Sequence, residues 1–286
     1  MRRSTQKQKF ALSVAPLYGW TVLFVLLPLL YVVLISFSKR GEIMGVESGF
    51  SLDGYLKMAD PLYGKVFLES FYTALLTTVL TLFIGYPFAY FTARQPKRVR
   101  GIIVLLLVAP FWLNSLIRLN GWVILLRSNG VINSVMQGIG IIDEPMKLLY
   151  TFGSVLVGMV YALAPFMILA IYNSVEKMDW TLVEAARDLG ATPAKAFFTV
   201  TLPQTAPGIT AGCVLVFVPS VGLFYVYDLF GGSKTMLLGS LIRDQMLMAR
   251  NWPFGAALAI VMLVLTLIAI GVYKKAAKTD GIGGIL

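Results

Sequence analysis

The chain has 286 residues, of which 58% are hydrophobic and 13% charged, and its mean hydropathy is +0.79. Soluble domains carry about 25% charged residues, so this composition excludes an ordinary soluble enzyme and predicts a membrane protein. The net charge is +10, there is no histidine, and Cys213 is the single cysteine. These counts exclude histidine-based catalysis, most zinc and haem sites, and any internal disulfide.

Six apolar stretches are long enough to cross the roughly 30 Å hydrocarbon core of a bilayer. They cover residues 14–37, 66–93, 101–119, 152–175, 205–228 and 254–273. The first is too long for the apolar region of a signal peptide and ends without a small-residue cleavage site, so we interpret it as a retained helix. The predicted fold class is all-α, a polytopic membrane protein with six transmembrane helices that form one domain over residues 1–286.

Proline lies inside five of the six spans. The five positions are Pro28, Pro87, Pro110, Pro165 and Pro219. Each removes a backbone hydrogen bond and is expected to kink its helix, although proline is also tolerated in membrane helices that their neighbours pack. Five prolines together favour bent helices around a cavity.

Lysine and arginine are distributed unequally between the two sides of these spans. The side with both termini, the 94–100 loop and the 176–203 loop carries 14 basic and five acidic residues, and the opposite side carries nine and seven. By the positive-inside rule both termini are cytoplasmic. The positive charge therefore indicates topology in a lipid membrane and gives no evidence of a nucleic-acid partner.

The cytoplasmic loop of residues 176–203 reads as a helix, a break and a second helix. Thr181 and Glu184 have the spacing of a capping box, in which two side chains bond to backbone N–H groups at a helix start. Gly190 suits the left-handed position that ends such a helix.

The second helix of this loop has its own start and stop signals. Thr192 is expected to cap it, with Pro193 at the first helical position, and Pro203 is expected to close it. The loop is therefore predicted to be a compact helical pair that projects from the bilayer into the cytoplasm.

This loop resembles the EAA motif of ABC importer permeases. The matching residues are Glu184-Ala185-Ala186, Gly190 four residues later, Phe197 and Leu202-Pro203. The resemblance implies that the first helix is the coupling helix, which docks in a groove of the ATP-binding subunit. The residues it assigns to this contact are Glu184, Ala185, Ala186 and Arg187, with Gly190 making the turn. The alternative is that Glu184 and Gly190 serve only as helix caps.

Three further segments are similar to the first permease subunit of spermidine/putrescine importers, the PotB type. They are FWLNSLIR at 111–118, LFYVYDLFGG at 223–232 and NWPFGA at 251–256. The resemblance covers residues 20–273 and implies a type I ABC importer permease fold in a prokaryotic inner or plasma membrane. It implies as partners two ABC ATP-binding subunits, a second homologous permease subunit and an external substrate-binding protein. No cofactor is expected in this chain, because ATP and magnesium would be bound by the ATPase subunit.

A path for polyamines needs carboxylates or carbonyls for the ammonium groups, and aromatic faces for cation–π contacts. Only two carboxylates lie inside the predicted spans, and ionisable groups there are functional candidates by default. Aromatic residues surround the second of them. The expected path residues are Glu69, Trp112, Asn114, Phe224, Tyr225, Tyr227 and Asp228.

These residues also have structural interpretations. The tyrosines and Phe224 could form an interfacial aromatic belt, Asp228 could be a solvated charge at a helix end, and Glu69 could pair with Lys65 one turn earlier. Arg118 is a poor ligand for a cation, and it could pair with one of the two carboxylates or contact the external binding protein.

The expected function is a permease subunit that moves polyamines from the binding protein to the cytoplasm by alternating access. The chain itself is expected not to be an enzyme, since residues 231–235 lack the frame of a phosphate-binding loop. One alternative is a permease for another small cation or organic solute. The other is a stand-alone secondary transporter, against which stand the lack of inverted-repeat symmetry and the small number of intramembrane acids.

Overall fold

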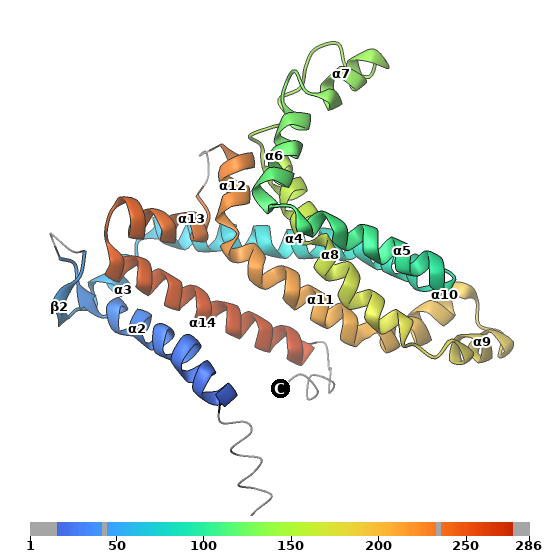
Figure 1. Cartoon of the computed structure of the whole chain (residues 1–286), viewed down its shortest axis with the longest axis horizontal. Helices are drawn as coiled ribbons and strands as arrows, with labels where there is room; N and C mark the ends of the chain where they lie inside the picture. Colours follow the sequence, from blue (N-terminus) through green and yellow to red (C-terminus); the bar gives the residue numbers. More distant parts are fainter. Residues whose placement is uncertain (1–15, 42–44, 233–235, 277–286) are drawn as a thin grey trace, which may run out of the picture. The chain divides into compact units, whose positions relative to one another are not determined.

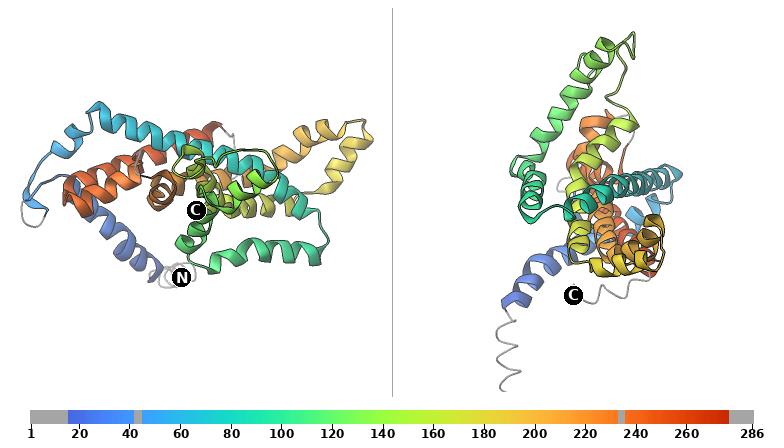
Figure 2. Two further views of the ribbon diagram at one scale, coloured as in Figure 1. Left: turned by 90° about the horizontal axis from the view of Figure 1, so that it is seen from above. Right: turned by 90° about the vertical axis from the view of Figure 1, so that its right-hand side faces the viewer.

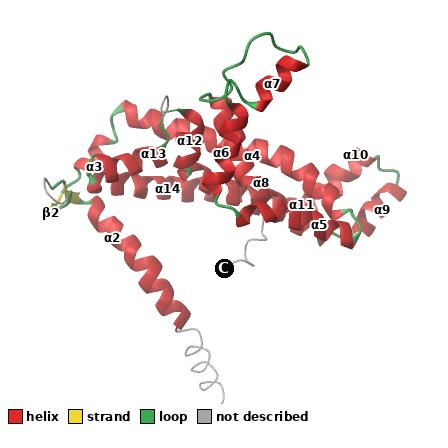
Figure 3. Ribbon diagram, turned by 45° about the horizontal axis from the view of Figure 1, so that its top comes forward, coloured by secondary structure: helices red, strands yellow, loops and turns green. Residues whose placement is uncertain are grey.

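The computed structural model of the chain describes residues 16–41, 45–232 and 236–276 (Figure 1). The basic residues predicted at positions 2–9, Lys278, and part of the 231–235 segment lie outside the described residues. Within them the chain is almost entirely helical, as Figure 3 shows. Five of the described helices are long and apolar enough to cross a membrane, and the number is six if a bent helix pair counts as one broken span.

Four of the predicted spans are confirmed as continuous helices. They correspond to Pro16–Ser36, which ends in α2 (Leu27–Ser36), to α4 (Pro61–Ala93), to α8 (Phe152–Glu176) and to α14 (Trp252–Ala276). Pro87 and Pro165 lie inside α4 and α8, whereas Pro28 lies in the first turn of α2, directly after a π-helical turn, η1 (Val22–Leu26). The long apolar runs therefore determine these spans, and proline does not end them.

The third predicted span, residues 101–119, is wrong as one straight helix. The structure has α5 (Lys97–Val108), the short 3-10 helix η2 (Ala109–Trp112), α6 (Ser115–Leu126) and α7 (Val131–Gly138), with a bend of 96° after η2. Leu113 is extended, and the Asn114 side chain accepts a hydrogen bond from Leu116 N at 2.8 Å, which caps a new helix. Arg118 therefore lies in the first turn of α6.

The fifth predicted span, residues 205–228, is wrong at both ends. A continuous helix runs over Pro193–Gly222 as α10 (Pro193–Ala196), the π-helical turn η3 (Phe197–Thr201) and α11 (Leu202–Gly222). It stops because Leu223 leaves the helical conformation, and the chain continues as a separate short helix, α12 (Phe224–Gly231). Asp228 therefore lies on α12 and does not end a long span.

The described residues belong to two compact units. The first combines residues up to Gly64 with Leu241–Leu265, and the second combines Lys65–Ser240 with the residues from Thr266 onward. The prediction of one domain over the whole chain stays a prediction.

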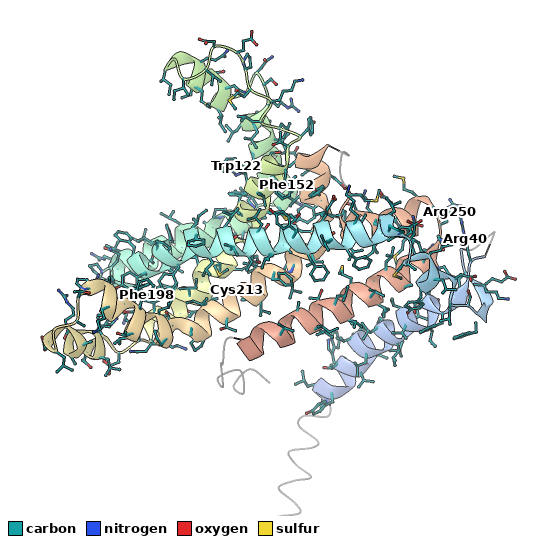
Figure 4. The ribbon with its side chains drawn as sticks, turned by 180° about the vertical axis from the view of Figure 1, so that it is seen from behind. Arg40, Trp122, Phe152, Phe198, Cys213 and Arg250 are labelled. Carbon is teal, nitrogen blue, oxygen red and sulfur yellow. The ribbon has the colours of Figure 1, made fainter. Side chains whose placement is uncertain are left out.

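The first unit contains the two-stranded antiparallel sheet. Besides η1, α2 and the first residues of α4, its elements are β1 (Ser38–Lys39), β2 (Glu47–Phe50), α3 (Asp53–Lys57), the end of α13 (Leu238–Arg243), η4 (Asp244–Met248) and the start of α14. Phe37 stacks on Tyr55 with ring centroids 5.1 Å apart, and the Tyr55 hydroxyl lies 2.8 Å from Ser36 Oγ. Arg40 donates to the Ala249 carbonyl at 3.1 Å, near Arg250 (Figure 4).

The second unit is a helical bundle in which α8 and α11 lie side by side (Figures 1 and 2). Glycines set their spacing, since a Cβ at Gly208 would collide with Ser174 and one at Gly212 with the Met167 sulfur. Small residues at such contacts let helix backbones approach closely in a membrane. A second cluster joins α6 and α12 to α8, with Phe230 of α12 fully buried in it. The contact of α8 with α11 and the cluster of α6, α8 and α12 together position the helices that carry the candidate path residues.

Candidate functional site

The loop of residues 176–203 begins with a cap on α9 (Trp180–Asp188). Asp179 accepts hydrogen bonds from Thr181 N at 3.0 Å and from Thr181 Oγ1 at 2.7 Å. These bonds hold the pKa of the Asp179 carboxyl below its ordinary value, because they favour the charged form. The predicted capping box of Thr181 and Glu184 is therefore wrong: the cap lies two residues earlier, where a carboxylate reaches the free N–H groups.

The end of α9 agrees with the sequence. Gly190 has a φ of +85°, and the N–H groups of Gly190 and Ala191 bond to the carbonyls of Arg187 (2.9 Å) and Ala186 (3.0 Å). A Cβ built on Gly190 would meet no atom within 4 Å. Backbone conformation alone therefore requires glycine here, since other L-residues are strained at this φ.

The residues expected to face an ATP-binding subunit lie on an outer surface of the second unit, at the end that Figure 1 marks with α9. Glu184, Ala185 and Arg187 are exposed, and Ala186 is half-buried. Leu182 is also exposed, and Leu189 is 90% exposed. Charged groups beside uncovered leucines are typical of a surface that packs against another protein.

An aromatic cluster holds the base of α9. The Trp180 ring lies 5.7 Å from Tyr90 of α4, and the Arg94 guanidinium lies 5.5 Å and 5.6 Å from these two rings. Phe197 of η3 completes the cluster at 6.2 Å from Tyr90. Sequence reasoning missed these residues, because it used the basic 94–100 loop only as a topology signal. The indole that directly follows the Asp179 cap was the available clue.

The second helix of the loop starts as predicted and does not end as predicted. Thr192 accepts a hydrogen bond from Lys195 N at 3.3 Å, and Pro193 occupies the first turn. Pro203 does not close the helix, because the π-helical turn η3 precedes it and Leu202 N bonds to Phe197 O, five residues back. A wider turn before Pro203 gives room to the proline ring, which has no N–H to donate to that turn.

The path residues on α12 have different environments. Phe224 and Tyr225 are half-buried and contact each other edge-to-face at 6.1 Å, whereas Tyr227 is only 4% exposed and belongs to the core cluster of α6, α8 and α12. Asp228 is exposed, and its Oδ1 accepts from Ser240 Oγ at 3.4 Å. The structure therefore leaves Phe224, Tyr225 and Asp228 at least partly accessible and buries Tyr227 in packing.

The other three path residues lie on different elements. Glu69 on α4 is 4.0 Å from Lys65, the pairing that its spacing allowed. Trp112 ends η2 and is 78% exposed, and Asn114 caps α6. The described residues contain no group of three or more histidine, cysteine or acidic side chains that could hold a metal ion.

A cavity of about 460 Å³ lies where the bent α5–α6 pair faces α8, α11 and the start of α12. Its aromatic walls include Phe111, Tyr161, Phe166 and Tyr225. Tyr225 is the one predicted path residue that lines it. Sequence reasoning missed Tyr161 and Phe166, because nothing local in α8 indicates which of its faces borders a cavity.

Arg118 also lines this cavity. Its guanidinium carbon lies 4.4 Å from the Phe111 ring centroid and 5.7 Å from that of Tyr161. Within the described part of the chain it forms no ion pair with Glu69 or Asp228, and its Nε is buried without a hydrogen-bond acceptor.

An ion pair also joins two helix ends of the second unit. Arg100 near the start of α5 and Glu176 at the end of α8 are 2.9 Å apart. The 94–100 loop and the 176–203 loop therefore lie at the same end of this unit.

The chain matches known proteins over nearly its whole length. Residues 85–278 match the family described as binding-protein-dependent transport system inner membrane component. The chain is 44% identical over 265 residues to the spermidine/putrescine transport system permease protein PotB of Escherichia coli (strain K12), an alignment covering 93% of this chain and 96% of that protein.

Two solved structures share the fold. One is a bacterial ABC transporter involved in the import of the acidic polysaccharide alginate, with a TM-score of 0.74 at 18% identity, covering 98% of this chain and 100% of that chain. The other is a bacterial alginate ABC transporter in complex with an alginate pentasaccharide-bound periplasmic protein, with a TM-score of 0.73 at 17% identity and coverage of 96% and 95%. The type I ABC importer permease fold is thereby confirmed.

Proposed function

The chain belongs to the family of binding-protein-dependent transport system inner membrane components, and from this membership we propose that it is the permease subunit of an ATP-driven importer for the polyamines spermidine and putrescine. The observation that carries the proposal is the 44% identity to a spermidine/putrescine permease across 93% of the chain. The chain is a multi-pass inner-membrane transport subunit and not itself an enzyme.

Its proposed partners are two ATP-binding subunits, a second homologous permease and an external substrate-binding protein. A related fold in complex with a periplasmic protein supports the last of these. ATP and magnesium are bound by the ATP-binding subunits, and the assembled complex hydrolyses ATP. This chain contributes a docking surface and half of the translocation path.

We propose α9 as the coupling helix, with Glu184, Ala185, Ala186 and Arg187 against the ATP-binding subunit and Gly190 at the turn. Closure of the ATP-bound subunits moves α9, and the contacts of Trp180 with Tyr90 and Arg94 pass that movement to the end of α4. Exposed charge and exposed leucine on α9 support this assignment.

The proposed substrate path combines the aromatic and acidic residues of α12 with the α5–α6 bend. Phe224 and Tyr225 offer ring faces to methylenes and ammonium groups, and Asp228 offers a carboxylate. Trp112, Asn114 and Glu69 are the remaining residues of the proposed path. Tyr227 supports α12 from the core. Substrate delivered by the binding protein enters this path when the cavity opens outward, and ATP hydrolysis returns the cavity to the inward-open state.

We propose that both termini are cytoplasmic. The ion pair of Arg100 with Glu176 supports this orientation, because it keeps the strongly basic 94–100 loop on the same side as the coupling loop. Docking on a cytoplasmic ATPase requires the coupling loop to lie on that side.

Uptake by the reconstituted complex tests the proposal. Proteoliposomes carrying this chain with its second permease and ATP-binding subunits are given binding protein outside and ATP inside, and radiolabelled spermidine and putrescine are followed. ATP-dependent accumulation that also requires the binding protein is expected. Retention of a different cation or solute by the binding protein would favour the alternative importer. Uptake by this chain alone, without ATP, would favour a secondary transporter.

A further inference from the structure

Arg118 is a charged side chain placed at membrane depth. The cavity that it lines also includes Tyr161 and Phe166 of α8. These two residues are 10 to 15 positions before Glu176, the cytoplasmic end of α8, which corresponds to about 15–22 Å at 1.5 Å per residue. A charge at this depth is costly unless it is paired, and it is a functional candidate by default.

The Arg118 guanidinium has aromatic neighbours, but its buried Nε has no hydrogen-bond acceptor among the described residues. Phe111 and Tyr161 offer their rings, while the buried Nε has no acceptor within the described residues. A buried donor without an acceptor costs free energy, so a missing acceptor is expected. The planar fork of arginine matches a carboxylate with two parallel hydrogen bonds.

Among the described residues, no carboxylate lines the cavity. Glu69 is near Lys65, Glu176 pairs with Arg100 and Asp244 with Arg243, while Asp228 accepts from Ser240. The cavity of a proposed cation importer thus presents aromatic rings and one positive charge. The negative charge that a polyamine needs at this depth must come from outside this chain.

We propose that Arg118 binds a carboxylate that the second permease subunit inserts into this cavity, and that an entering polyamine ammonium takes the carboxylate from Arg118. The inference rests on the proposed function, because it requires a second permease and a cationic substrate. The donor is a membrane-spanning chain, since an external binding protein reaches only the outer mouth and the cavity walls extend to the middle of α8.

This exchange makes Arg118 a residue that determines specificity. While the cavity is empty, the carboxylate is neutralised and does not attract single monovalent cations. A polyamine brings several ammonium groups along one chain, so it competes for the carboxylate while its other charges are held elsewhere in the path. Released from the carboxylate, Arg118 stays over the Phe111 ring, where a cation–π contact stabilises it.

Charge reversal in the full reconstituted complex tests the pairing. Arg118→Glu is expected to lower spermidine uptake about tenfold, because it places two carboxylates together. Each intramembrane Asp or Glu of the second permease is changed to Lys, alone and with Arg118→Glu, and one combination is expected to restore uptake to within about threefold of wild type. Arg127→Glu, a reversal at the exposed far end of α6, is the control and is expected to keep uptake.

Cysteine cross-linking tests proximity even where Arg118→Glu does not assemble. In a Cys213→Ala background, Arg118→Cys and a cysteine at the restoring or candidate carboxylate of the second permease are expected to form a disulfide without substrate. Spermidine is expected to slow its formation at least about threefold, because substrate separates the two positions.

The inference is overturned if no second-permease position cross-links to residue 118, or if no charge exchange with the second permease restores uptake. Uptake by the wild-type complex in the same vesicles distinguishes failure of the proposed function from failure of the Arg118 pairing. If the wild-type complex carries no polyamine, the proposed function fails. If it does and the Arg118 pairings fail, only this inference is rejected.

Discussion

The proposed coupling loop, residues 176–203, and the cavity differ in how they are assembled. The loop is built from neighbours in sequence: a cap at Asp179, a left-handed turn at Gly190 and a second cap at Thr192. The cavity is built mainly from helices that are far apart in the sequence, and it takes Arg118 from one and Tyr225, 107 residues later, from another. A site made of local signals can be recognised in a sequence, whereas a site made by packing requires the packing to be known.

The largest effect is expected from reversing charge on the coupling helix. Glu184→Lys should weaken binding of the ATP-binding subunit about 30-fold or more, in line with the ~2 kcal/mol or more lost when one partner of an interfacial charge pair is removed. Co-purification and surface-binding measurements with the ATPase subunit check it. Glu144→Lys, an exposed reversal in the α7–α8 loop, is the control, and equal binding by both variants would remove α9 from the interface.

A pair of glycine substitutions tests whether the turn depends on conformation alone. Gly190→Ala should destabilise the end of α9 by about 1–2 kcal/mol and reduce ATP-driven uptake, because alanine is strained at this φ. Gly121→Ala in α6 is the matched control, since a Cβ at either position meets no atom within 4 Å. It should be neutral or stabilising by about 0.5–1 kcal/mol. Equal thermal stability and uptake of the two variants would contradict the role of the left-handed turn.

Neutralising the carboxylate of α12 tests the proposed path outside the cavity. Asp228→Asn should lower polyamine uptake about two- to fivefold, the range expected for an exposed ion pair, while assembly of the complex stays intact. Transport rates at several spermidine concentrations measure it. Asp143→Asn, another exposed carboxylate, serves as the control. Unchanged uptake would make Asp228 a solvated charge with no part in the path.

The smallest effect is expected at the cap of α9. Asp179→Ala should speed amide exchange at Thr181, whereas Asp179→Asn should preserve the cap. Hydrogen bonding lowers the pKa of Asp179 in the folded protein below its ordinary value of 3.8. The charge-dependent part of the cap's stabilisation is therefore complete above that value and is lost as pH falls through the lowered pKa. Exchange rates of wild type and Asp179→Asn that respond identically to acid would contradict this.

Much of the fold could be predicted, because apolar length determines membrane spans almost without regard to context. Gly190, Thr192 and Pro193 were predictable for a related reason, since each acts through its own backbone. The Asp179 cap was missed because Thr181 and Glu184 also match a capping pattern, and only the structure shows which residue reaches the free N–H groups.

The breaks at Leu113 and Leu223 were not predictable from residue type, because leucine favours helix and both lie inside apolar runs. The buried position of Tyr227 depends on packing against α6 and α8, which no local pattern encodes. The same holds for Arg118, whose surroundings come from helices distant in sequence. The predicted and observed sites therefore differ where a residue's surroundings are set by contacts between helices that are distant in sequence.

The unbroken helix Pro193–Gly222 has a mechanical consequence. It starts three residues after Gly190, the turn that ends α9, and Leu215 and Pro219 near its other end line the cavity. Its 30 residues correspond to about 45 Å at 1.5 Å per residue. In the proposed mechanism a movement of α9 therefore reaches the cavity wall through one continuous helix, in which the π-helical turn at Phe197–Thr201 is the irregular segment nearest to α9.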